Sequence, residues 1–251
     1  MLQFASTFLM LTYSLTKNRF LGFASWVLFG FFWLLNLPYY LSINDYFNCF
    51  LMLSAFAIFA LIGATIFKTN DDVFVRLSYI AALSSLIYFS FAETWLGRRL
   101  IEIVAQQTVV LASFFGYNFA VTGDVILYNS KSVQIILACT GIESIALFAG
   151  IALGASATVE NRVKAFLVSV PTIYILNLFR NVFIIAAYGD EWFGENSFYL
   201  AHHVISKFLA TIALILIAMQ VFKYLPKFAD DIFEAKDLVV RTWLRGKEQE
   251  S

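Results

Sequence analysis

The chain has 251 residues, of which 61% are hydrophobic and 14% are charged, and its formal net charge is zero. A soluble domain carries about 25% charged residues, so this chain lacks the polar side chains to cover a globular surface. These values exclude a disordered chain, a disulfide scaffold and an ordinary soluble enzyme, and the neutral charge leaves no basic surface for nucleic acid. They predict an all-α protein, a polytopic transmembrane helical bundle.

Apolar runs recur along the whole chain, and a membrane span needs about 20 apolar residues. The runs lie at 1–16, 20–40, 46–67, 77–92, 100–120, 133–159, 165–188 and 198–222. The run at 77–92 becomes long enough if residues 73–76 join it. The first run lacks the basic region and cleavage site of a signal peptide, so we interpret it as a retained helix or half-helix. Six to eight spans are expected, depending on whether the runs at 1–16 and 100–120 cross the membrane.

Composition and charge divide the chain further. We predict an integral membrane domain at 1–225, with a catalytic core at about 100–225, and a solvated, amphipathic cytoplasmic tail at 226–251. Residues 121–133 alternate and carry Gly, Asn and Ser, which predicts a short external strand or hairpin. Basic residues at 160–164 and in the tail place both regions in the cytoplasm, whereas the acidic loop at 189–197 belongs outside.

Three side chains of catalytic type lie inside three successive apolar runs. At 1.5 Å per residue, Cys139, Arg180 and His202 lie roughly 9, 12 and 6 Å from the outer ends of their helices. Because successive helices alternate in direction, all three should meet in the outer third of the membrane. Ionisable groups at such depths are costly and often mark function.

Helical spacing adds supporting residues. Glu143 follows Cys139 by about one turn and is either a structural partner for Arg180 or a catalytic group. Asn177 shares a face with Arg180 and is expected to orient its guanidinium. Tyr199 is expected to share a face with His202 and Ser206.

Each of these residues also has a plain structural interpretation. A cysteine in an apolar helix is usually an inert small hydrophobe, and we apply that interpretation to Cys49. An arginine near a helix end can snorkel to the interface, and a histidine there can be an anchor. Their meeting in one layer favours nucleophilic catalysis by the Cys139 thiolate. His202 would then serve as general acid and Arg180 as oxyanion stabiliser.

Three segments in chain order resemble the exosortase/archaeosortase family, most closely its archaeosortase members. They are ACTGIESIALFAG around Cys139, VPTIYILNLFRNVFI around Arg180 and FYLAHHVISK around His202. The resemblance implies a membrane cysteine transpeptidase with Cys139 as nucleophile, Arg180 as oxyanion stabiliser and His202 as third residue, with His203 as the alternative. Family members are thought to recognise a C-terminal sorting signal made of a short motif (PGF in the archaeal case), a hydrophobic helix and a basic tail.

The resemblance also implies what the enzyme acts on. It would remove the C-terminal helix of secreted surface proteins and join the new C-terminus to a membrane phospholipid. The charges of the loops predict that the active site lies near the extracellular face of the plasma membrane. No cofactor or metal is expected. Two other functions remain open: an intramembrane endoprotease whose acceptor is water, and a transporter with a polar gate. A transporter would carry polar residues through the full membrane depth, so their clustering on one side favours the enzyme.

Overall fold

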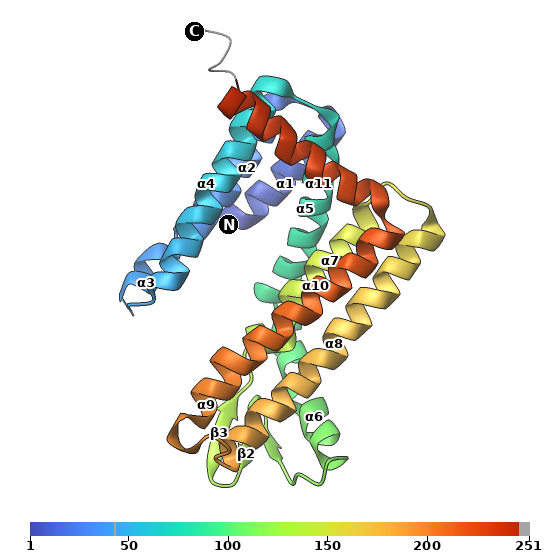
Figure 1. The fold of residues 1–251 in the computed structure, drawn as a ribbon. Coiled ribbons are helices and arrows are strands. Elements are labelled where there is room, and N and C mark those ends of the chain that lie inside the picture. The colour runs from blue at the N-terminus through green and yellow to red at the C-terminus, as the bar shows by residue number, and fades with distance from the viewer. Residues whose placement is uncertain (43, 246–251) are drawn as a thin grey trace. The chain divides into compact units, whose positions relative to one another are not determined.

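The computed structural model of the chain describes residues 1–42 and 44–245. The chain forms two compact units, whose helices and strands Figure 1 labels. The first unit comprises Met1–Leu86, Leu153–Thr158 and Leu225–Ser251, and the second comprises Ile87–Ala152 and Val159–Tyr224. All three predicted catalytic residues belong to the second unit.

The first unit is built of helices around an apolar core. Its elements are α1 (Leu2–Thr16), α2 (Arg19–Leu34), α3 (Leu37–Ser42), α4 (Tyr46–Thr69), most of α5 (Asp72–Ala92), α11 (Pro226–Val240) and the π-helical η4 (Arg241–Arg245). The Asn18 side chain caps α2 by accepting the Phe20 N–H, and Asn70 ends α4 in the left-handed conformation. The core gathers side chains of α1, α2, α4 and α5, among them Tyr13, Trp26 and Ile66.

The predicted amphipathic tail forms helix α11, but this helix is docked within the first unit rather than solvated. Ala235 joins the apolar core, and the side chain of Asp231 is only 3% exposed. Arg76 donates hydrogen bonds of 2.7 to 3.2 Å to the Asp231 carboxylate, and Lys227 lies 3.0 Å from it. Burial favours the neutral acid, but these bonds hold the pKa of Asp231 below its ordinary value. Residues 246–251 of the predicted tail lie outside the described residues.

The second unit combines long helices with a small sheet. Its elements are the end of α5, α6 (Trp95–Ser113), β1 (Ala120–Thr122), β2 (Val125–Tyr128), β3 (Lys131–Gln134), η1 (Leu137–Thr140), most of α7 (Ile142–Gly154), α8 (Val159–Gly189), η2 (Gly194–Asn196), α9 (Ser197–Tyr199), η3 (Leu200–Ile205) and α10 (Ser206–Tyr224). The strands pair antiparallel in the order β1-β2-β3, with Ile126 opposite both Val121 and Val133. The predicted strand or hairpin at 121–133 is therefore confirmed.

The sheet is held against two helices by a second apolar core. Ile126 and Ile135 pack with Val104 of α6 and with Val182 and Ile185 of α8. Burial of this one face holds the sheet and the segment that follows β3 against the C-terminal half of α8, which is where the candidate site lies.

Five helices are long and apolar enough to cross a membrane, counted over the part of the chain that the structure describes. They are Arg19–Ser42, Asn48–Thr69, Asp72–Ala92, Val159–Gly189 and Gly194–Tyr224. The predicted all-α membrane protein is confirmed, and residues 73–76 do extend the run at 77–92. The run at 1–16 forms the 15-residue helix α1.

The run at 133–159 is not one continuous helix as expected. It divides into β3, the 3₁₀ turn η1 and the 13-residue helix α7, and Gly141, in a left-handed conformation with φ of 76°, separates the turn from the helix. At 1.5 Å per residue α7 extends for roughly 20 Å, less than the ~30 Å of a hydrocarbon core.

The two ends of the second unit differ in charge. At one end Lys164 of α8 interacts electrostatically with Tyr224 of α10, so the basic residues at the start of α8 and the end of α10 share one side as predicted. At the other end Lys131 forms a 3.0 Å ion pair with Glu191, and Asn129 donates a 2.8 Å hydrogen bond to Asp190. The sheet and the acidic loop therefore lie together, opposite the basic end.

Candidate active site

Cys139 lies in the 3₁₀ turn η1 between the sheet and α7, not within a helix as the sequence predicted. The turn begins at Leu137, separated by two residues from the end of β3, and is capped by Gly141. A 3₁₀ turn leaves backbone groups without helical partners. Cys139 is half-buried and packs against the core formed by α6, α8 and the sheet.

Two asparagines of α8 hold this turn in place. Asn177 and Asn181 donate their side-chain amides to the carbonyl oxygen of Cys139, at 2.6 and 3.0 Å. Asn177 was expected to orient Arg180; its amide nitrogen donates to the Cys139 carbonyl instead, and a role toward Arg180 stays a prediction. Asn181, 3% exposed, was not among the predicted site residues. Its spacing of four from Asn177, which puts both on one helix face, was the signal that could have found it.

Arg180 and His202 meet as predicted. Nη2 of Arg180 lies 3.4 Å from Nε2 of His202, and an electrostatic interaction also links the guanidinium to Cys139. Arg180 lies nine residues before the end of α8 at Gly189, and His202 lies eight residues after the start of the next span at Gly194. The two side chains therefore reach the same level from antiparallel helices.

His202 sits in the π-helical turn η3, a local widening of the helix that is often found at functional sites. Its ring stacks on Phe198 at 5.2 Å with an interplanar angle of 5°. A guanidinium can only donate, so the contact with Arg180 makes Nε2 the acceptor and leaves the proton on Nδ1. Nδ1 is buried and has no hydrogen-bond partner among the described residues.

The adjacent His203 faces a different way. It is exposed, and its ring lies 5.5 Å from that of Tyr199, which is itself 60% exposed. The prediction that Tyr199 shares a helix face with His202 and Ser206 is therefore wrong. Of the two histidines, His202 is the one that contacts Arg180.

Glu143 does not pair with Arg180, counting all ion pairs within the described ranges. It is exposed in the first turn of α7 and interacts electrostatically with Tyr88 of α5. The structural half of the prediction for Glu143 is therefore wrong, and the catalytic half stays a prediction.

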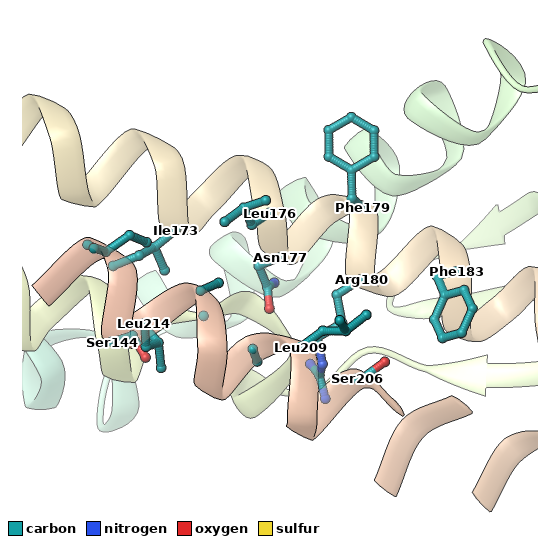
Figure 2. Close-up of a pocket in the computed structure, with 14 residues that line it drawn as sticks. Ser144, Ile173, Leu176, Asn177, Phe179, Arg180, Phe183, Ser206, Leu209 and Leu214 are labelled. Carbon is teal, nitrogen blue, oxygen red and sulfur yellow. The ribbon is translucent and has the colours of Figure 1, made fainter. Parts of the chain in front are cut away.

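Two cavities flank the contact between Arg180 and His202. The smaller, of about 170 Å³, is lined by Cys139 and His202 together with Asn181 and Phe198. The larger, of about 460 Å³, lies between α7, α8 and α10 and is lined by Arg180 (Figure 2). A thiol and an imidazole thus face one small cavity, with a cation in contact with the imidazole. These are the groups that acyl transfer through a thioester requires.

The turn that carries Cys139 depends on a glycine. A Cβ atom on Gly141 would lie 3.3 Å from Cβ and Cγ of Asn177, and its φ of 76° is strained for any other residue. Gly123 has a similar φ of 63°, but a Cβ atom there would have no neighbour within 4 Å among the described residues, so it offers a matched control.

We expect Gly141→Ala to reduce substrate processing at least tenfold, because the turn and Asn177 must move apart and the thiol moves with them. The left-handed strain of about 1–2 kcal/mol is common to Gly141→Ala and Gly123→Ala, so only the former should lose activity. The processed fraction of a co-expressed substrate, at matched abundance of the two variants, measures this. Equal activity of both would show that the turn does not position the thiol.

The fold and the site together define an integral membrane protein with a cysteine, an arginine and a histidine gathered between its helices. Residues 4–219 match the family described as Transmembrane exosortase (Exosortase_EpsH), and the chain belongs to this family. It is therefore a multi-pass membrane protein that takes part in protein sorting.

Two relatives are both named archaeosortase A. The protein from Haloferax volcanii is 30% identical over 242 residues, which cover 81% of this chain and 80% of that protein. The protein from Natronomonas pharaonis is 26% identical over 259 residues, which cover 90% of this chain and 82% of that protein. No solved structure matches the chain.

Proposed function

We propose that the chain is a membrane-embedded cysteine transpeptidase that cleaves the C-terminal sorting signal of secreted surface proteins and joins the new C-terminus to a membrane phospholipid. The observation that carries the proposal is the small cavity that Cys139 and His202 line together, beside the 3.4 Å contact of His202 with Arg180. The similarity to two proteins named archaeosortase A supports a sorting-signal substrate.

The proposed reaction has two steps. In the first, His202 takes the proton of the Cys139 thiol, and the thiolate attacks the carbonyl carbon of the scissile peptide bond. Arg180 stabilises the oxyanion, and the C–N bond then breaks as His202 returns the proton to the leaving amine. The product is a thioester on Cys139 and a released C-terminal helix.

In the second step the acceptor attacks the thioester carbonyl. Its amine or hydroxyl loses a proton to His202, the C–S bond breaks, and the thiolate of Cys139 is restored. Because Nδ1 already carries a proton in this tautomer, His202 can accept one only at Nε2, so its contact with Arg180 must open as the proton arrives.

An endoprotease would share the first step and differ only in the acceptor, which would be water. Mass spectrometry of the mature C-terminus of a co-expressed secreted protein with a tripartite sorting signal tests the proposal. We expect a C-terminus lengthened by a lipid. A free carboxylate would identify an endoprotease, and an unprocessed signal would remove the enzyme hypothesis and leave the transporter.

We propose further that the site opens toward the outer face of the plasma membrane. The support is the acidic end of the second unit, where the sheet and the loop at 189–197 lie, against the basic end near Lys164 and Tyr224. Glu195 is exposed at the acidic end, and Glu160 is exposed in the first turn of α8.

Orientation can be measured in a Cys49→Ala, Cys139→Ala background. We expect Glu195→Cys to react with a membrane-impermeant maleimide in intact cells, and Glu160→Cys to react only after the cells are broken. The two variants are the same substitution at exposed sites, one in the first turn of α8 and the other in η2, which follows the end of α8. The reverse pattern would place the chemistry on the cytoplasmic side.

A further inference from the structure

The larger cavity has a composition that the cleavage step does not explain. Of the residues that line it within the described chain, only Arg180 is charged. Most of the others are aliphatic or aromatic, such as Ile173, Leu209 and Leu214. Figure 2 shows Arg180 beside Ser206 and Leu209, and Ile173 with Leu214 well away from it. From Arg180 to Ile173 is seven residues of α8, or roughly 10 Å.

Ser206 adds a second polar group at the charged end. The residue lines the cavity and is 3% exposed, and its hydroxyl has no hydrogen-bond partner among the described residues. A buried hydroxyl without a partner is unfavourable unless a ligand or a water molecule forms a hydrogen bond with it. Ser206 follows directly after η3, so the π-helical turn that brings His202 to Arg180 also brings this hydroxyl to the cavity.

The occupant must therefore be anionic or strongly polar at one end and apolar along the rest. Guanidinium groups bind phosphate well, because several N–H donors can reach its oxygens at once. A hydroxyl beside the guanidinium adds one more donor. Apolar walls over two helical turns suit a hydrocarbon chain.

Size separates a lipid from the other apolar ligand of this reaction, the helix of the sorting signal. One turn of an α-helix with its side chains fills roughly 400–600 Å³, and a membrane-spanning helix has about five turns or more. The cavity holds about 460 Å³, which is one such turn. Pockets of this size hold single small ligands.

We propose that the larger cavity binds the acceptor phospholipid, with its phosphate at Arg180 and Ser206 and one hydrocarbon chain between α8 and α10. The role as acceptor rests on the proposed transpeptidase function, whereas the binding itself does not. Because Arg180 lines this cavity and contacts His202, the headgroup would lie next to the imidazole that takes its proton.

Photolabelling tests the binding without turnover. The full-length Cys139→Ala protein in detergent micelles is labelled with a phosphatidic acid that carries a diazirine on one acyl chain, and the labelled peptides are located by mass spectrometry. We expect labels on residues 173–183 or 206–217. Unlabelled phosphatidic acid should compete at least tenfold better than diacylglycerol with the same chains.

Three variants separate the headgroup from the chain. Ser206→Ala should weaken competition by phosphatidic acid about tenfold, the loss of one hydrogen bond to a charged group, and leave diacylglycerol unchanged. Ala213→Phe narrows the cavity and should weaken both lipids. Ile215→Phe, on the same helix but 56% exposed and outside the cavity lining, is the control and should change neither.

The proposal is overturned if the labels lie elsewhere, if both lipids compete equally, or if Ser206→Ala binds as well as the parent. Competition by a synthetic sorting-signal helix at the same sites, without competition by phosphatidic acid, would also overturn it and assign the cavity to the substrate. Ser206-dependent binding together with a free carboxylate on the mature substrate would keep the lipid site and remove lipid transfer. Failure of the lipid-binding proposal and failure of the proposed transpeptidase function therefore give different results.

Discussion

We expect Cys139→Ala to abolish substrate processing and to leave the abundance of the protein in the membrane unchanged. Among the described residues that line the small cavity with His202, Cys139 carries the only thiol, so its loss should remove the proposed covalent step rather than slow it. Cys139→Ser should be nearly as inactive, because a hydroxyl is a far weaker nucleophile than a thiolate at neutral pH. The fold should persist, since the bonds from Asn177 and Asn181 go to the backbone carbonyl of residue 139 and not to its side chain.

Cys49→Ala is the matched control for this loss. Cys49 is the other cysteine of the chain, buried in α4 of the first unit, and its alanine variant should process substrate at close to the parent rate. Immunoblots of a co-expressed substrate, with membrane abundance measured for each variant, give the comparison. Processing by Cys139→Ala at even a tenth of the parent rate would be incompatible with covalent catalysis by this residue.

We expect Arg180→Lys to lose most of the activity, about as much as Arg180→Ala. Removal of one oxyanion donor typically costs ~10²–10³ in rate. The guanidinium contacts His202 through Nη2 and also lines the larger cavity, and a single ammonium cannot do both. If the residue were a snorkelling anchor instead, the flexible stem of lysine would reach the interface equally well.

The control for this change is Arg99→Lys on α6. Arg99 belongs to the same unit, is 70% exposed and forms an ion pair with Glu102, so lysine should replace it without loss. The processed fraction over time, at matched abundance, separates the alternatives. Near-parent rates for Arg180→Lys would assign the residue to structure and leave the oxyanion without its proposed donor.

Spacing along the chain predicted the meeting of Arg180 and His202 well. Both lie in long helices of opposite direction, so residues counted from the shared end convert directly to depth. The hairpin at 121–133 was equally predictable, because alternating polarity and turn residues are local signals of a strand pattern.

The surroundings of Cys139 were not predictable in the same way. Residues 133–159 are largely apolar, and hydropathy does not reveal where the backbone changes from strand to turn to helix. The break depends on the conformation of Gly141 and on bonds from Asn177 and Asn181, which lie about 40 residues further along the chain. The docking of α11 was missed for a similar reason, since the Arg76–Asp231 pair joins residues 155 positions apart.

The side-chain clamp on the Cys139 carbonyl also bears on how the protein is made. An apolar environment offers a backbone carbonyl no water, so a non-helical turn can settle there only when protein donors are present. For η1 those donors lie on α8, which leaves the ribosome after it. During synthesis the Cys139 carbonyl should therefore stay hydrated, and the turn should take its final position only after α8 has been made. The surroundings of Cys139 are thus completed late in biogenesis, by a helix that the chain has not yet produced when the cysteine emerges.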